Sequence, residues 1–264
     1  MAITNHFDKN ASTAWHPGSM VKLMTAIITR EWISDGELDD TVTIVASDTV
    51  NPLTNSNMGL KDGDVISYRD LLYGLMLPSG NDAGLALARL IGGMILVDEG
   101  GVDTDASANR TRFVSEMNTR AGDLDLTTAV FTDSYGIAAG NRMSPEDAAK
   151  LMFAYASDAL LKTIAGTTSR LITITGANSR TYTVNHTIDP SGPVPFPEFV
   201  CGKTGTVTTP GDPAETSGGC CAMLWESPLG VQRVSVVMGA DPASERFTDL
   251  RRLIDYELAR LGEL

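Results

Sequence analysis

Strand-forming segments are concentrated in the last third of this 264-residue chain, and this uneven distribution limits the folds that it can adopt. Runs rich in β-branched and aromatic residues favour strands. Such runs occupy residues 171–175, 180–184, 199–206, 219–225 and 231–238. The turn Ser-Pro-Leu-Gly joins the last two runs, which predicts an antiparallel hairpin. A helical pattern over residues 243–261 then closes the chain.

Helical patterns dominate the middle of the chain, over residues 68–77, from residue 83 onward, over 112–121 and over 145–156. The last of these has a strong start, with Ser144 as N-cap and Pro145 at the first helical position. Because strands and helices do not alternate regularly, a doubly wound sheet is disfavoured. We expect an α+β fold in one domain, residues 1–264. An antiparallel sheet would be covered by the first and last helices, with a mostly helical lobe inserted between its edges.

The two lobes and the first elements can be placed approximately. The α/β lobe is expected over about residues 1–45 plus 170–264, and the helical lobe over about 46–169. Residues 3–7 form a short candidate strand, and a helix is expected from Ser19 to about residue 35, followed by a strand over 41–45. Polar residues 51–57 and the acidic, glycine-rich residues 97–109 are expected to be loops.

The charge balance excludes some classes of partner. With 33 acidic and 20 basic residues the net charge is −13, which argues against nucleic acid or an anionic membrane surface. No apolar run approaches the roughly 20 residues that span a bilayer, so no transmembrane segment is expected. Residues 1–9 lack the pattern of a signal peptide. The protein is therefore expected to be cytosolic or to have lost its targeting segment.

The cysteines and histidines do not have the spacing of a metal site, so we expect neither a metal nor a cofactor. The histidines are His6, His16 and His186, and the cysteines are Cys201, Cys220 and Cys221. An odd number of cysteines leaves at least one thiol without a partner in the chain. Cys201 and Cys220 lie on successive expected strands and would face one another in one register of pairing, which the sequence leaves open.

Ser19 and Lys22 form the first candidate for chemistry. They are three residues apart at the start of an amphipathic helix, so the Lys22 amine can reach the Ser19 hydroxyl. A serine nucleophile needs such a base, and burial lowers the pKa of a lysine towards its neutral form. Ser-x-x-Lys alone occurs by chance in a chain of this length, and a surface serine beside a helical lysine is the alternative interpretation.

Ser-x-Asn occurs twice, at Ser79 with Asn81 and at Ser107 with Asn109. The first pair lies in a tight polar turn between two apolar helices, where buried polar side chains must be held by hydrogen bonds. The second pair lies in the acidic segment, where water can satisfy it. We therefore take Ser79 and Asn81 as the functional pair and Ser107 as structural.

Lys203, Thr204 and Gly205 form the only Lys-Thr-Gly in the chain, at the end of an expected strand. The glycine permits close approach of a ligand to the strand backbone, the lysine supplies a cation, and the threonine offers a hydroxyl to a carboxylate or carbonyl. The alternative interpretation is an edge-strand lysine followed by a bulge.

In this order the three motifs resemble those of the β-lactamase and penicillin-binding protein superfamily. Segments 113–118, 131–136 and 143–147 look like the connecting segments of serine D-alanyl-D-alanine carboxypeptidases, the low-molecular-weight penicillin-binding proteins. The resemblance covers residues 7–256. It implies a serine D-Ala-D-Ala carboxypeptidase that trims peptidoglycan stem peptides, binds β-lactam antibiotics covalently and acts outside the cytoplasm.

The resemblance also implies a role for each motif residue. Ser19 would be the nucleophile and Lys22 its base, while Ser79, held by Lys203, would pass a proton to the leaving amine. Asn81 would bind the substrate's amide carbonyl. Thr204 and Thr206 would bind the terminal carboxylate, beside Gly205. The backbone N–H groups of Ser19 and Thr206 would form the oxyanion hole.

The chain departs from the family pattern in its first residues, because members normally have two strands before the nucleophile helix. An N-terminal strand is therefore expected to be missing from a trimmed start. A serine β-lactamase is the first alternative. It needs a glutamate followed by Leu and Asn at the third and fourth positions, and the candidates Glu99, Glu116, Glu146 and Glu198 lack them. The second alternative is a non-catalytic β-lactam sensor or peptidoglycan-binding module on the same fold.

Overall fold

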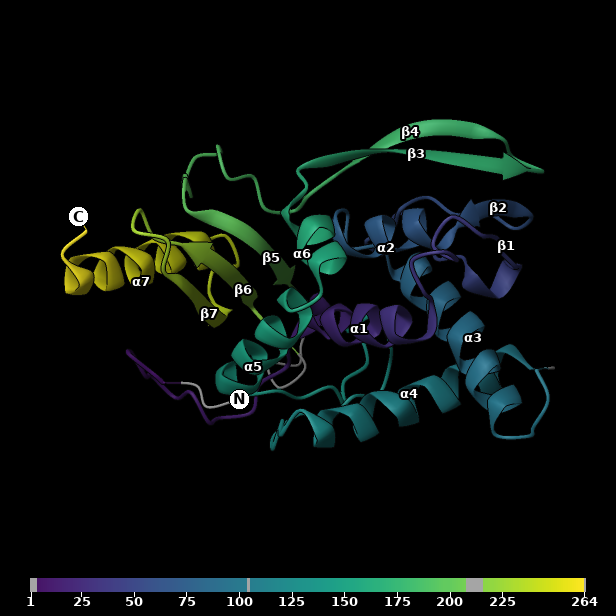
Figure 1. Cartoon of the computed structure of the whole chain (residues 1–264), viewed down its shortest axis with the longest axis horizontal. Helices are drawn as coiled ribbons and strands as arrows, with labels where there is room; N and C mark the ends of the chain where they lie inside the picture. Colours follow the sequence, from purple (N-terminus) through teal and green to yellow (C-terminus); the bar gives the residue numbers. More distant parts are fainter. Residues whose placement is uncertain (1–3, 104, 208–215, 264) are drawn as a thin grey trace.

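The computed structural model describes residues 4–103, 105–207 and 216–263, and most of its long strands follow the helices along the chain (Figure 1). The 3-10 turns are η1 (Gly18–Val21) and η2 (Ala46–Asp48). The helices are α1 (Lys22–Trp32), α2 (Tyr68–Met76), α3 (Asn81–Asp98), α4 (Ala106–Asp123), α5 (Pro145–Ala156), α6 (Ala159–Gly166) and α7 (Glu245–Leu261). The strands are β1 (Thr41–Thr43), β2 (Asp64–Ser67), β3 (Ser169–Gly176), β4 (Arg180–Asn185), β5 (Phe199–Gly205), β6 (Gly219–Glu226) and β7 (Gln232–Ala240).

The strands form two antiparallel sheets, one of order β1-β2-β3-β4 and one of order β5-β6-β7. The expected α+β class with antiparallel pairing is confirmed, including the hairpin of β6 and β7. The difference is that β3 and β4 join the sheet of β1 and β2, where Asp64 pairs with Gly176, rather than extending the sheet of β5. The unforeseen strand β2 makes this link. It was missed because a run of four residues carries little periodicity.

The three-stranded sheet is buried on both faces. Alternate residues of β6 point to opposite sides. Cys220, Ala222 and Leu224 join the main core, whereas Cys221, Met223 and Trp225 pack against α7. The last helix therefore covers one face as expected, but the other face is covered mainly by α5. The first helix, α1, instead lies in the centre of the helical core.

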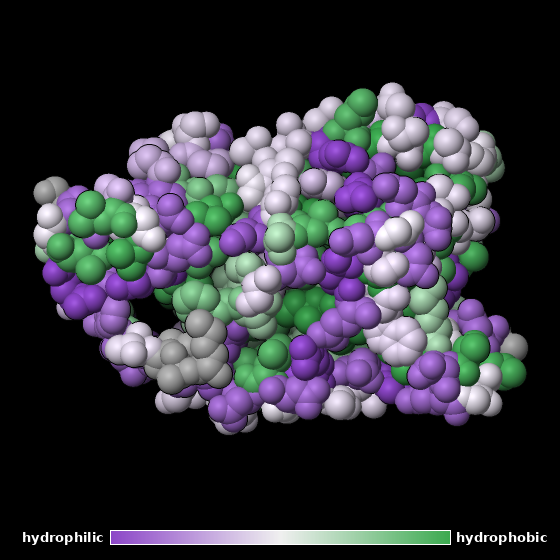
Figure 2. Space-filling model, viewed as in Figure 1, coloured by the Kyte–Doolittle hydropathy of each residue, from purple (hydrophilic) through white to green (hydrophobic). Residues whose placement is uncertain are grey.

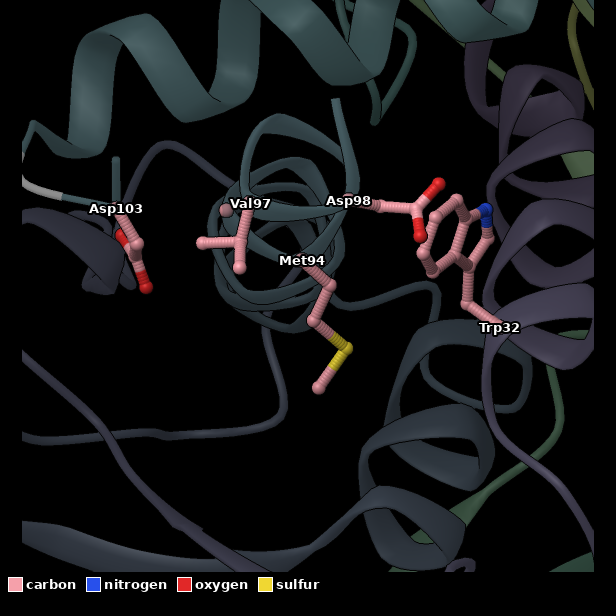
Figure 3. A pocket seen from close by; sticks show the side chains of 6 residues that line it. Trp32, Met94, Val97, Asp98 and Asp103 are labelled. Atoms are coloured by element: carbon pink, nitrogen blue, oxygen red, sulfur yellow. The ribbon is translucent and has the colours of Figure 1, made fainter. Parts of the chain in front are cut away.

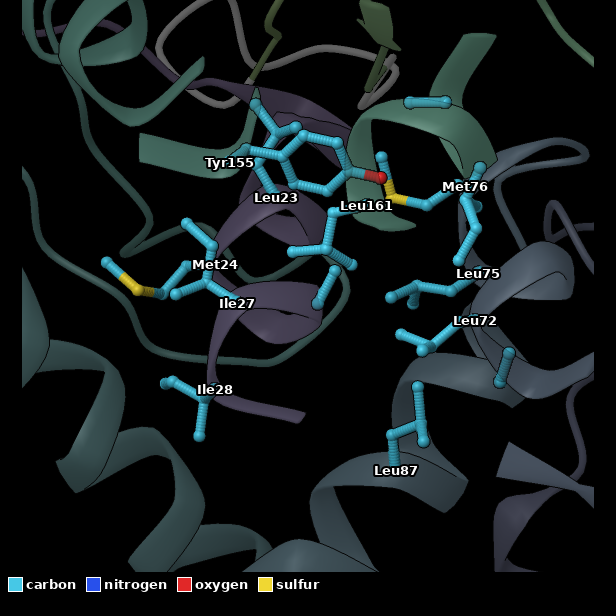
Figure 4. Packing of buried hydrophobic residues seen from close by; sticks show 14 of the residues in the cluster. Leu23, Met24, Ile27, Ile28, Leu72, Leu75, Met76, Leu87, Tyr155 and Leu161 are labelled. Atoms are coloured by element: carbon cyan, nitrogen blue, oxygen red, sulfur yellow. The ribbon is translucent and has the colours of Figure 1, made fainter. Parts of the chain in front are cut away.

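The buried face of α1 organises that core. Leu23, Met24, Ile27 and Ile28 are buried among side chains of α2, α3 and α6, with Tyr155 of α5 beside them (Figure 4). Burial of each such side chain contributes about 1.5–3 kcal/mol. Packing of this face against the core holds α1 in place, and with it the turn that carries Ser19.

In Figure 2 hydrophilic residues cover much of one face of the molecule.

Side-chain caps begin several helices. Ser144 accepts a hydrogen bond from the Asp147 N–H, as its sequence predicted. Asp105 accepts from the N–H groups of Ser107 and Ala108, so α4 begins at Ala106, six residues before the expected start. The expectation of a loop over residues 97–109 was therefore wrong at both ends, because α3 also continues to Asp98. Asp158 caps α6, a helix that the sequence analysis missed.

The expected strand over residues 3–7 is not formed by residues 4–7, and Ile3 lies outside the described residues. Side chains hold this segment instead. The His6 ring is 2.8 Å from a Glu257 carboxylate oxygen, and the Phe7 ring stacks edge-on against Tyr256 of α7. None of the described helices is both long and apolar enough to cross a lipid bilayer.

Candidate active site

The turn that carries Ser19 is held against the end of β5. Gly18 has a φ of +54°, and a Cβ there would lie 2.7 Å from the Thr206 nitrogen. A Cβ on Gly205 would lie 2.2 Å from the Pro17 oxygen and 3.2 Å from the Ser19 nitrogen. Two glycines thus allow backbones far apart in sequence to meet. The contact places the backbone of residues 17–19 against that of residues 205–206.

Ser19 and Lys22 are brought together, although Ser19 lies on η1 and only Lys22 begins α1. The Lys22 Nζ is 2.9 Å from the Ser19 Oγ, 2.8 Å from the Asn81 Oδ1 and 2.6 Å from the Tyr135 carbonyl oxygen. The last two atoms can only accept hydrogen bonds. A neutral amine would therefore donate its two N–H groups to them and keep its lone pair for the Ser19 hydroxyl.

Burial tunes Lys22 for this role. The side chain is fully buried, and desolvation lowers its pKa from 10.5 to about 7, with the carboxylates of Asp133 and Asp82 opposing the shift. An amine with that pKa is neutral in a large fraction of molecules at pH 7. It can act there as a general base.

Ser79 and Asn81 lie in the turn from α2 to α3, as the sequence predicted. Ser79 has a φ of +63°, a backbone conformation that is uncommon outside glycine and concentrates at functional sites. The Asn81 N–H donates to the Ser56 oxygen at 2.9 Å, and its Nδ2 donates to the Asn55 Oδ1 at 3.2 Å. Asn55 therefore fixes the amide so that its oxygen faces Lys22.

Lys203 joins the second motif to the third. Its Nζ donates to the Ser79 Oγ at 2.8 Å and to the Thr204 carbonyl oxygen at 3.0 Å. The side chain is fully buried, so desolvation lowers its pKa well below the ordinary value, and the nearby Lys22 lowers it further. Two buried lysines thus disfavour each other's charge.

Arg246 is a site residue that sequence reasoning missed. From the first turn of α7, its Nη1 donates to the Gly205 carbonyl oxygen at 3.0 Å and to the Thr206 Oγ1 at 2.5 Å. It places a guanidinium beside Thr206, one of the two threonines that were expected to bind a carboxylate. No motif marks it, because it lies 40 residues after Thr206.

The loop after α4 supplies the other missed residues. Asp133 accepts hydrogen bonds from the backbone N–H groups of residues 135–138 and from the Asn141 side chain. This buried cradle fixes the Tyr135 carbonyl oxygen that faces Lys22. The sequence analysis noted segment 131–136 only as a connecting segment, because every residue type has a backbone carbonyl oxygen and none signals its use as an acceptor.

Ser107 and Asn109 are not part of this site. Both lie on α4, and Asn109 Nδ2 donates to Asp103 at 2.6 Å. Asp103, with Trp32 and Met94, helps to line a shallow hollow between the ends of α1 and α3, shown in Figure 3. None of the predicted catalytic residues lines that hollow.

Cys201 and Cys220 do not face one another, which settles the register that the sequence left open. In the register of β5 and β6, Cys201 pairs with Leu224, and Cys220 pairs with Gly205 four residues further along β5. All three cysteines are buried and free. Burial raises the pKa of Cys201 and Cys221 to about 12 and that of Cys220 to about 11.

The four glutamates weighed for a β-lactamase are engaged in ion pairs. Glu99 and Glu116 both pair with Arg112, at 2.7 and 2.8 Å. Glu146 pairs with Lys150 at 3.5 Å, and Glu198 with Arg251 at 2.7 Å. None of these cations belongs to the three motifs, so the ion pairs do not direct the carboxylates towards Ser19.

Comparison with known proteins gives a consistent picture. The family model described as D-alanyl-D-alanine carboxypeptidase matches residues 6–211. The D-alanyl-D-alanine carboxypeptidase of Streptomyces sp. (strain K15) is 35% identical over 180 residues, which cover 66% of this chain and 58% of that protein. DacD of Escherichia coli (strain K12), with the same name, is 35% identical over 143 residues, covering 52% of this chain and 33% of that protein.

Solved structures extend the similarity to the strands and helix beyond residue 211. The crystal structure of the Streptomyces K15 DD-transpeptidase superposes with a TM-score of 0.78 at 28% identity, covering 96% of this chain and 91% of that one. The expected fold of this superfamily is thereby confirmed. The chain still spans 58% or less of the two curated relatives named above.

Proposed function

Because the chain belongs to the D-alanyl-D-alanine carboxypeptidase family, we propose that it hydrolyses the bond between the two terminal D-alanines of peptidoglycan stem peptides. The observation that carries the proposal is the position of the Lys22 Nζ, which lies 2.9 Å from the Ser19 Oγ while two further acceptors take its N–H groups. In keeping with its substrate, the enzyme acts in the cell envelope, outside the cytoplasm. Residues 1–264 work as one catalytic domain.

Acylation begins at the Ser19 hydroxyl. Neutral Lys22 takes its proton as the Oγ bonds to the carbonyl carbon between the two D-alanines. The negative charge that develops on the carbonyl oxygen is stabilised by the backbone N–H groups of Ser19 and Thr206. The C–N bond then breaks. Lys22 gives its proton to the leaving amine through the Ser79 hydroxyl, which Lys203 holds at 2.8 Å, and becomes neutral again.

The terminal carboxylate of the substrate lies at the other end of the site. Thr204 and Thr206 donate hydroxyl hydrogen bonds to it, and Arg246 supplies the positive charge that two hydroxyls lack. Gly205 has no side chain, so the substrate can approach the strand backbone closely at this point. Asn81 offers its remaining N–H to the amide carbonyl of the stem peptide. This arrangement explains selection for a free C-terminal carboxylate, and a β-lactam antibiotic, which carries an equivalent carboxylate, reacts with Ser19 in the same way.

Deacylation completes the cycle when D-alanine has left. A water molecule takes its place, gives a proton to Lys22, and attacks the ester carbon. The bond from that carbon to the Ser19 Oγ then breaks, and Lys22 passes its proton to the Oγ. Transfer to an amine in place of water is a second candidate reaction. It is favoured by the name of the K15 neighbour, a DD-transpeptidase.

The β-lactamase alternative is less well supported, because the four glutamates weighed for water activation are held in ion pairs with Arg112, Lys150 and Arg251. The alternative of a non-catalytic sensor predicts acylation without turnover.

Release of D-alanine from diacetyl-L-lysyl-D-alanyl-D-alanine tests the proposal. The wild-type protein is expected to release one D-alanine per peptide over many turnovers, and Ser19→Ala none. Addition of glycine as an acceptor amine distinguishes transfer from hydrolysis by the mass of the peptide product. Wild-type protein that binds penicillin but releases no D-alanine would support the sensor.

A further inference from the structure

The segment that follows β4 touches two of the three motifs at once. Thr187 Oγ1 lies 2.7 Å from Thr204 Oγ1 of the third motif. The Thr187 backbone N–H donates to the Leu77 oxygen at 3.1 Å, two residues before Ser79 of the second motif. One residue therefore links the end of α2 to the strand that carries Lys203 and Thr204. Neither the proposed mechanism nor any motif assigns it a role.

The position of Thr187 is fixed by its neighbours. The His186 N–H donates to the Thr168 oxygen at 2.8 Å, and the Ile188 N–H donates to the His186 Nδ1 at 2.8 Å. Ile188 is buried against β5, where a Cβ on Gly202 would come within 2.8 Å of its Cδ1. The side chain of Thr187 is exposed, so its hydroxyl borders the site without filling the core.

The direction of the hydrogen bond between the two hydroxyls follows from what Thr204 must do. A hydroxyl has one proton to donate and two lone pairs that accept. If Thr204 donates its proton to a substrate carboxylate, the bond to Thr187 requires Thr187 to be the donor. Donation by Thr187 then turns the Thr204 proton away from Thr187 and strengthens its bond to the carboxylate, since chained hydrogen bonds polarise one another.

We propose that Thr187 is a positioning residue for the substrate's terminal carboxylate, acting through the Thr204 hydroxyl. The inference rests on the proposed function. It deepens that function by assigning part of the selection for a free carboxylate to a residue outside the three motifs. Without the Thr187 hydroxyl, Thr204 can turn its proton towards other acceptors. The acylation rate then falls more for ligands with a carboxylate than for ligands without one.

The test compares two ligands across three variants. Second-order rate constants for acylation of Ser19 are measured with benzylpenicillin and with its methyl ester, which has no carboxylate. Thr187→Val removes the hydroxyl at nearly constant side-chain volume, and Thr187→Ser keeps a hydroxyl at this position. Thr183→Val is the matched control, because Thr183 is an exposed threonine of β4, the strand just before Thr187, and pairs with Leu171. Thermal unfolding of each variant checks that the fold is retained.

We expect Thr187→Val to slow acylation by benzylpenicillin by up to about tenfold, the upper end for one hydrogen bond between neutral groups. The acylation rate with the methyl ester should stay within about twofold of the wild-type rate. Thr187→Ser and Thr183→Val should both keep the wild-type ratio of the two rates. Equal slowing of both ligands, or no slowing of either, would overturn the inference alone. A wild-type protein that neither acylates nor releases D-alanine would overturn the proposed function, and the inference with it.

Discussion

Acylation of Ser19 should rise with pH and level off near pH 8, because only the neutral form of Lys22 accepts the serine proton. Burial lowers the Lys22 pKa from 10.5 to about 7. This lowering corresponds to about 5 kcal/mol of destabilisation of the protonated amine. At pH 7 the neutral fraction is thus about one half, against about one in 3,000 for a solvated lysine.

The two cases give different pH profiles. With a pKa of about 7 the rate rises about tenfold from pH 6 to pH 8 and then stays level. With an ordinary pKa it would rise about a hundredfold over the same interval and continue to rise.

The assay is stopped-flow acylation by a fluorescent penicillin from pH 5.5 to 9.5. Circular dichroism at each pH serves as the control for folding, and the carboxylate of the penicillin stays ionised throughout. A rate that is still rising steeply at pH 9, or one that does not change between pH 6 and 8, would refute the argument that burial prepares Lys22 as the base.

Three further outcomes are expected. Ser19→Ala should retain the melting temperature within a few degrees but lose all penicillin labelling, and labelled Ser19→Ala would place the nucleophile elsewhere. Gly205→Ala should lower the unfolding free energy by about 1–3 kcal/mol and remove most of the acylation rate, because its Cβ would lie 2.2 Å from the Pro17 oxygen. Chemical denaturation measures the loss of stability, and Gly122→Ala on α4, where the added Cβ meets open space, is the control. Thiol titration should find three free cysteines in denatured, unreduced protein and very slow reaction in native protein, since burial raises their pKa values; fewer than three would indicate a disulfide.

The three motifs could be predicted from the sequence because each depends on local spacing. The distance of three residues from Ser19 to Lys22 brings both to one side of the chain whether the first turn is 3-10 or α-helical. The turn at Ser79 was marked by the polar residues between two apolar helices. The class of fold followed from the concentration of strands near the C-terminus.

The other parts of the site depend on tertiary contacts that leave no local pattern. Tyr135 contributes a backbone oxygen, and Arg246 arrives from the last helix. Thr187 is one exposed threonine among many until the segment after β4 is placed beside Leu77 at the end of α2. The same reason explains the cysteines: their register depends on how β5 and β6 pair, and a shift of a few residues separates Cys201 from Cys220.

The most direct measurement of the central claim is the mass of the intact protein, followed over time after addition of benzylpenicillin and then of the D-alanyl peptide. The account predicts an increase by one penicillin on the peptide that contains Ser19, lasting many minutes, because the opened ring keeps its leaving nitrogen tethered and obstructs water. In unlabelled protein the D-alanyl peptide should be turned over without a lasting adduct. Loss of the penicillin adduct within seconds, with hydrolysis of a large excess of penicillin, would contradict the account and identify a β-lactamase.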